Sequence, residues 1–206
     1  MTGRFMMVAV LMAALLFTSG CEPTQGGTDA VYTQEVPPAG APHLPPGTSV
    51  EATIVGTGDA TALLESRPEL AEAVILELPG YLGSIGLSGS HFTVATEVLG
   101  GRESEGGAEL YIDGVIHWWT LEGGRLEYQS AGEFIGRMRF KEPADKLVFS
   151  AWDQPLDGAL LIPGIETLFP RPYSDRAISR LGPNRAEMWR QGEQLGQEWA
   201  ASQVAN

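Results

Sequence analysis

Three things are scarce in this chain of 206 residues: cysteine, long apolar runs and positive charge. A single cysteine, Cys21, excludes a disulfide-stapled scaffold and a Cys-based zinc finger, since both need several thiols. The N-terminal apolar run, Met6–Phe17, would span only about 18 Å as a helix, against roughly 30 Å of bilayer hydrocarbon. Lys and Arg total 13 against 26 Asp and Glu, and the net charge of −13 repels a phosphate backbone. We therefore expect no nucleic-acid partner.

The first twenty residues have the three parts of an export signal. Arg4 supplies positive charge, Met6–Phe17 is apolar throughout, and the small or polar residues Thr18–Gly20 run into Cys21. This segment resembles the lipobox of bacterial lipoproteins, in which a small residue precedes a cysteine that is diacylated and becomes residue one after cleavage. The resemblance implies a signal peptide over 1–20 and lipidation of Cys21. An ordinary signal peptide with an incidental cysteine is the alternative.

A lipidated Cys21 would hold the chain on a membrane, because each buried CH₂ contributes about 0.8 kcal/mol and two or more acyl chains bind stably. Glu22 follows the cysteine, where the inner-membrane retention signal of the lipoprotein family is Asp. The resemblance therefore implies the outer membrane, with the protein facing the periplasm.

Composition divides the rest of the chain into three segments. Residues 21–49 hold six of the fourteen prolines and form a Pro/Gly-rich linker from the lipidated Cys21, because such sequences favour extended backbone and cannot bury a core. Residues 50–170 are predicted to form a β-rich globular domain. Residues 171–206 form an Arg-containing helical segment, whose arginines recur every four or five positions and are expected to pair with the acidic body or, alternatively, with an acidic partner.

The fold predicted for the mature chain is α+β and mainly β: an antiparallel meander or sandwich-like sheet with short N-terminal helices and one C-terminal helix. The helices are two short ones within Asp59–Ala73, broken near Arg67, and one from Arg185 to about Gln203. Asp113-Gly114 predicts a hairpin turn, and Gly123-Gly124 a second turn. The predicted strands are Val50–Val55, Val74–Leu78, His91–Leu99, two within Leu110–Trp119, Arg125–Ser130, Glu133–Phe140 and Leu147–Trp152. Asp153–Pro172 is predicted to be irregular.

Candidate binding residues are aromatic or glycine. The tryptophans at 118, 119 and 152 could stack on sugar rings, and the consecutive pair should place one ring on each sheet face, with one of the two outward or edge-exposed. On the C-terminal helix, two glycines four residues apart make a flat place where another backbone could approach, either the protein's own sheet or a partner. The full set is Trp118, Trp119, Trp152, Gly192, Gly196 and Trp199.

Motifs of catalysis, cofactor binding and metal binding are incomplete. Gly86–Ser90 resembles a nucleophile elbow but ends in Ser instead of Gly. Gly56–Thr61 lacks the third glycine of a dinucleotide-binding loop. Asp153–Gly158 opens like an EF-hand, but the acid required at the twelfth position is missing. We therefore expect no catalytic residue, no cofactor and no metal.

These features predict a lipid-anchored envelope lipoprotein that acts as a structural, assembly or binding component. Its partner would be an envelope protein, and an accessory lipoprotein of a secretion or conjugation apparatus is a specific version of this prediction. The alternative is a module that binds carbohydrate or peptidoglycan, or a hydrolase that uses acids such as Asp113, Glu127 or Asp153.

Overall fold

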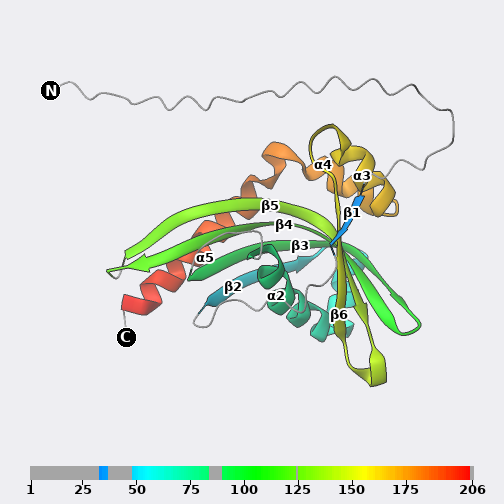
Figure 1. Cartoon of the computed structure of the whole chain (residues 1–206), viewed down its shortest axis with the longest axis horizontal. Helices are drawn as coiled ribbons and strands as arrows, with labels where there is room; N and C mark the ends of the chain where they lie inside the picture. Colours follow the sequence, from blue (N-terminus) through cyan, green and yellow to red (C-terminus); the bar gives the residue numbers. More distant parts are fainter. Residues whose placement is uncertain (1–32, 37–47, 84–89, 124, 205–206) are drawn as a thin grey trace, which may run out of the picture. The chain divides into compact units, whose positions relative to one another are not determined.

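The computed structural model describes residues 33–36, 48–83, 90–123 and 125–204 (Figure 1). All of them belong to one compact unit, Val31–Asn206. The predicted signal peptide, 1–20, and Cys21 lie outside the described residues. No helix in the described ranges is long and apolar enough to cross a membrane.

The described chain contains six β-strands, five α-helices and three short 3-10 helices. The 3-10 helices are η1 (Pro143–Asp145), η2 (Gly158–Leu160) and η3 (Gly182–Arg185). The strands are β1 (Thr33–Val36), β2 (Ser49–Gly56), β3 (His91–Ser104), β4 (Gly107–Glu122), β5 (Arg125–Lys141) and β6 (Val148–Pro155). The helices are α1 (Asp59–Ser66), α2 (Pro68–Gly83), α3 (Leu161–Leu168), α4 (Tyr173–Arg180) and α5 (Ala186–Val204).

The six strands form a single sheet in the order β1-β6-β5-β4-β3-β2. The α+β class is confirmed. The prediction of a purely antiparallel sheet is wrong, because β2 runs parallel to β3 while the other pairs are antiparallel. A parallel neighbour requires a crossover connection, which α1 and α2 supply. Helices make up so much of the described chain that a mainly β composition is not confirmed.

Two local signals were misleading. Asp113-Gly114 lies in the middle of β4, where Asp113 pairs with Glu97, so no turn forms there. Gly114 serves close packing instead, since a Cβ added to it would lie 2.7 Å from the carbonyl oxygen of Ala95. The predicted strand Val74–Leu78 belongs to α2.

The other differences concern element length. The two strands predicted over 125–140 are one continuous strand, β5, and α3 occupies part of the segment 153–172 that was predicted to be irregular. The predicted linker, 21–49, contains β1, which pairs with β6 and satisfies backbone groups along the edge of that strand. The helix break at Arg67 and the C-terminal helix are confirmed.

The sheet has one face that is mainly apolar and one that is not. On the apolar face, Leu70, Val74 and Leu78 of α2 pack against strand residues such as Val94 and Ile116. The opposite face, here called the polar face, is covered by α3, α4 and α5 (Figure 1). Its buried polar and charged side chains include His91, Thr93, Glu97, Asp113, His117 and Arg185.

Candidate functional site

Four of the six predicted binding residues meet where α5 crosses the sheet. The backbone carbonyl of Gly192 accepts a hydrogen bond from Thr93 Oγ1 at 2.7 Å, and Thr93 Oγ1 accepts one from Trp119 Nε1 at 3.0 Å. A Cβ added to Gly196 would lie 2.7 Å from Cε2 of the Trp119 indole. The two glycines therefore let α5 approach the protein's own sheet, and this surface is not open to a partner.

Trp199 extends the same contact toward the edge of the sheet. Its ring stacks on His91 with a centroid separation of 3.7 Å and an interplanar angle of 7°. His91 is fully buried, and its Nδ1 lies 2.7 Å from Ser49 Oγ. Burial lowers the pKa of His91 to about 4, so the ring is neutral at pH 7.

The remaining two tryptophans lie elsewhere. Trp118 and Trp152 belong to the apolar core under α2, with 3% and 0% of their surface exposed. Trp119 is also only 7% exposed, so the expected outward ring at 118 or 119 is wrong. Adjacent strand positions do point to opposite faces, but helices cover both faces and therefore bury both rings.

A groove of about 600 Å³ opens beside this contact, between α5 and the ends of β4 and β5. Its aromatic wall is Tyr128, 53% exposed, whose ring meets Trp119 edge to face with centroids 5.3 Å apart. We call this site the hairpin groove. It is lined by Trp119, Leu126, Tyr128, Glu193, Gln197 and Ala200.

The hairpin groove combines an exposed aromatic ring with polar groups on α5. Gln197 can donate and accept hydrogen bonds, while the Glu193 carboxylate accepts them. Sequence reasoning missed Tyr128 as a site residue. The available signal was the alternation of Leu126 and Tyr128 with the polar residues Glu127 and Gln129, which is typical of a strand with one face partly open to solvent.

Ion pairs hold the C-terminal segment on the polar face. Arg185, 3% exposed, pairs with the fully buried Asp113 and with Glu133. Arg180 pairs with Glu97. Burial raises the pKa of Asp113 to about 6 despite its arginine partner, and burial also raises the pKa of Glu97.

The three acids considered for hydrolysis do not come together. Asp113 is paired with Arg185 at the centre of the sheet, and Glu127 is exposed on β5. Asp153 accepts hydrogen bonds from Nε of Arg137 and Nε of Arg139, both at 2.9 Å. Among the residues that the structure describes, no three His, Cys, Asp or Glu side chains are grouped so that they could hold a metal ion.

No protein-family model matches the chain, and neither a curated protein nor a solved structure shows significant similarity to it. A fold alone does not determine an activity. A function is therefore inferred from the chemistry of the hairpin groove.

Proposed function

We propose that this protein is a lipid-anchored domain of the cell envelope that binds a saccharide segment in the hairpin groove. The observation that carries the proposal is the exposed Tyr128 ring, which lies beside the amide of Gln197 and the carboxylate of Glu193 in one groove. A sugar ring offers a C–H face to an aromatic side chain and hydroxyl groups to amide and carboxylate partners.

The size and composition of the groove favour a ligand of this class. Its volume of about 600 Å³ lies within the roughly 300–1,000 Å³ of small-molecule sites. Apolar walls from Leu126 and Ala200 face a small number of polar groups, an arrangement that fixes a ligand's orientation. The polar groups suit a hydroxyl-rich, uncharged ligand better than an anion, since the only charged residue of the lining is Glu193.

The proposed role is binding without hydrolysis. Glycoside hydrolysis requires two carboxyl groups roughly 5–9.5 Å apart that flank the bond to be cleaved. The lining of the hairpin groove contributes a single carboxylate, Glu193, and no histidine. A bound polysaccharide would therefore be held and left intact.

Lipidation at Cys21 would place this domain beside the cell wall, whose glycan strands are a saccharide polymer. We expect Cys21→Ser to lose metabolic acyl labelling and to release the chain into the soluble fraction. A Thr24→Ala variant, altered three residues downstream, serves as the control and should remain labelled and membrane-bound. Membrane retention of Cys21→Ser would contradict the anchor.

The saccharide site is tested with the full chain carrying Cys21→Ser, which avoids detergent. Binding to purified peptidoglycan is measured by co-sedimentation, and binding to soluble glycan fragments by calorimetry. We expect Tyr128→Ala and Gln197→Ala each to weaken binding about tenfold or more, because each removes one contact worth about 1.4 kcal/mol.

Matched controls come from exposed residues outside the groove. Val148→Ala removes an apolar side chain that is 41% exposed on β6, and Gln194→Ala removes an exposed amide from the same helix as Gln197. Both variants should bind as the parent does. Equal loss in controls and groove variants, or no binding of glycan by the parent chain, would overturn the saccharide proposal.

A further inference from the structure

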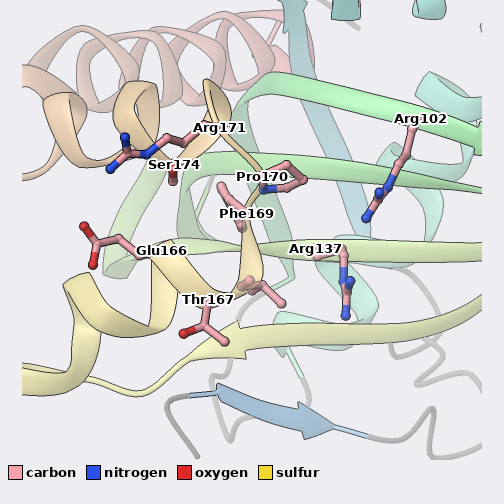
Figure 2. A pocket seen from close by; sticks show the side chains of 9 residues that line it. Arg102, Arg137, Glu166, Thr167, Phe169, Pro170, Arg171 and Ser174 are labelled. Atoms are coloured by element: carbon pink, nitrogen blue, oxygen red, sulfur yellow. The ribbon is translucent and has the colours of Figure 1, made fainter.

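A second cavity lies at a different place on the polar face, between the sheet and the segment that joins α3 to α4. Its volume is about 480 Å³, and three of its lining residues are arginines from distant parts of the sequence. We call it the arginine pocket (Figure 2). Its lining is Arg102, Arg137, Glu166, Thr167, Leu168, Phe169, Pro170, Arg171 and Ser174.

The lining of the arginine pocket is rich in arginine although the chain is acidic. The chain as a whole carries a net charge of −13, whereas the pocket lining contains three arginines and one glutamate. Carboxylates outside the lining pair with these arginines: Glu109 with Arg102 and Arg137, Asp153 with Arg137, and Asp175 with Arg171. The pocket therefore offers several guanidinium N–H donors to an anion and no large excess of positive charge. The pocket shares no lining residue with the hairpin groove.

The strand register brings two of the guanidinium groups together. Arg102 of β3 is paired with Glu109 of β4, and Arg137 of β5 is paired with Tyr111, two residues further along β4. The carboxylate of Glu109 lies between the two, 3.0 Å from Nε of Arg102 and 3.6 Å from Nη1 of Arg137. One carboxylate thus holds two cations side by side.

Further contacts fix the orientation of Arg137. Its Nε donates to Asp153 Oδ2 at 2.9 Å, and Asp153 is buried with 4% of its surface exposed. A guanidinium has five N–H donors, so the contacts to Glu109 and Asp153 leave donors for a ligand. Because the buried Asp153 and the partly buried Glu109 hold the side chain, Arg137 needs little further ordering when a ligand binds.

The remaining lining gives the pocket a second charged side. Figure 2 shows Phe169 and Pro170 between Arg102 and Arg137 on one side and Arg171 and Glu166 on the other. Phe169 is buried, so its ring supports the wall of the pocket and offers little surface to a ligand. The cavity, about 480 Å³, is larger than a bare inorganic ion requires, so it suits an anionic group attached to a small organic body.

We propose that the arginine pocket binds a small organic anion, whose carboxylate or phosphate group is held by Arg102 and Arg137 and whose organic part lies beside Pro170. Two guanidinium groups match the paired oxygens of either anion, because each can donate two parallel N–H bonds. This site goes beyond the saccharide function and is independent of the hairpin groove.

The test uses the full chain carrying Cys21→Ser and four probes of similar size: benzoate, phenyl phosphate, benzamide and benzylamine. Calorimetry at low salt should give binding of benzoate, of phenyl phosphate or of both, and at least tenfold weaker binding of the neutral and cationic probes. The stronger of the two anions identifies the head group. Raising the salt concentration should weaken the interaction, since the contacts are partly exposed to solvent.

Variants then assign the binding to the pocket. Arg102 is 59% exposed at its side chain, so Arg102→Gln should fold normally and weaken anion binding about tenfold or more. Arg137→Lys keeps the positive charge but loses the planar guanidinium group with its paired N–H donors, so it should weaken anion binding as well. Arg190→Gln is the control, because that exposed arginine lies on α5 outside the pocket and should bind the anion unchanged.

Two results would overturn the proposal: equal affinity for benzoate and benzamide, or equal loss of binding in Arg102→Gln and Arg190→Gln. Glycan binding by Arg102→Gln separates this site from the hairpin groove. Retained glycan binding together with lost anion binding supports two independent sites, whereas loss of both ligands in that variant would contradict their independence.

Discussion

The two faces of the sheet are covered by helices in different ways. On the apolar face, α2 makes contact through aliphatic side chains such as Leu70, Val74 and Leu78, all buried against the strands. On the polar face, α5 approaches so closely that glycine is required at 196, and the turn before it inserts Arg185 between Asp113 and Glu133. The apolar face is held mainly by burial of apolar surface, whereas the polar face combines two smaller apolar clusters with buried ion pairs and close contacts.

Apolar contacts and buried ion pairs respond differently to pH and to the loss of one partner. Burial of apolar surface contributes roughly 25 cal/mol per Å² whatever the relative orientation of the groups, and it is insensitive to pH. A buried ion pair is different, because removal of one partner leaves the other charged in an environment that disfavours charge. We therefore expect the two faces to respond differently to the same kind of substitution, and pH to separate them.

The largest effect is expected on the apolar face, for Trp152→Ala. Trp152 is fully buried and packs edge to face against Phe134, so the substitution leaves a large cavity. We expect the free energy of unfolding to fall by about 3–5 kcal/mol, by the same amount at pH 5 and pH 7.5. Urea denaturation measures this loss. Leu76→Ala, at a residue 72% exposed on α2, should change stability by about 0.5 kcal/mol or less.

On the polar face, Arg185→Met should lower the free energy of unfolding by about 3 kcal/mol at pH 7.5, because it leaves the carboxylate of Asp113 buried without its partner. The pKa of Asp113 is already raised to about 6, so at pH 5 the group is protonated and the loss should be smaller. Arg190→Met, at an exposed position of α5, is the control. A loss that does not vary between pH 5 and pH 7.5 would point to packing alone and contradict this account.

The sequence predicted those parts of the fold that depend on local patterns. The strand beginning at His91, the helix break at Arg67 and the C-terminal helix follow from spacing within about ten residues. The run Val74–Leu78 predicts a strand wrongly, because five apolar residues are too few to distinguish a strand from a buried helix. Leu70, Val74 and Leu78, four residues apart and all buried, show the helical period only when α2 is considered whole.

The candidate site was only partly predictable for the same reason. The glycines at 192 and 196 predicted a close approach, since the absence of a side chain is a local property. Their partners could not be inferred, because Thr93 and Trp119 are 99 and 77 residues away from Gly192 and Gly196 along the chain. Both Tyr128 in the hairpin groove and the pairing of Arg102 with Arg137 around Glu109 depend on the strand register, which sequence patterns did not fix.

His91, on the polar face, should give a pH-dependent effect on stability of intermediate size. Its pKa is lowered from 6.5 to about 4 by burial, so the unfolded chain takes up a proton at this residue before the folded one does. Stability contributed by the neutral ring is present above pH 6.5 and is lost as the pH falls toward 4, by about 2 kcal/mol at pH 5.

His91→Phe keeps an aromatic ring beside Trp199 and cannot ionise, so it isolates this effect. Asp113 has the opposite sign, because its raised pKa makes the folded state bind a proton first between about pH 6 and 3.8. Asp113, Glu97 and His117 titrate in both proteins, and their contributions cancel in the difference. The stability difference between parent and His91→Phe should therefore shift by about 2 kcal/mol from pH 7.5 to pH 5, and a constant difference would contradict a buried neutral His91.

The smallest expected effect concerns the close approach itself. In Gly196→Ala, the new Cβ would lie 2.7 Å from the Trp119 ring, so α5 or the indole must move. Overpacking of this kind costs about 1–3 kcal/mol, and the better helix propensity of alanine returns about 1 kcal/mol, which leaves a net loss of about 1 kcal/mol. Since Trp119 also lines the hairpin groove, the same variant should shift its fluorescence and weaken glycan binding, whereas Gln194→Ala should do neither. A gain in stability would mean that α5 is not seated on Trp119. The close approach of α5 would then no longer distinguish the polar face from the apolar face.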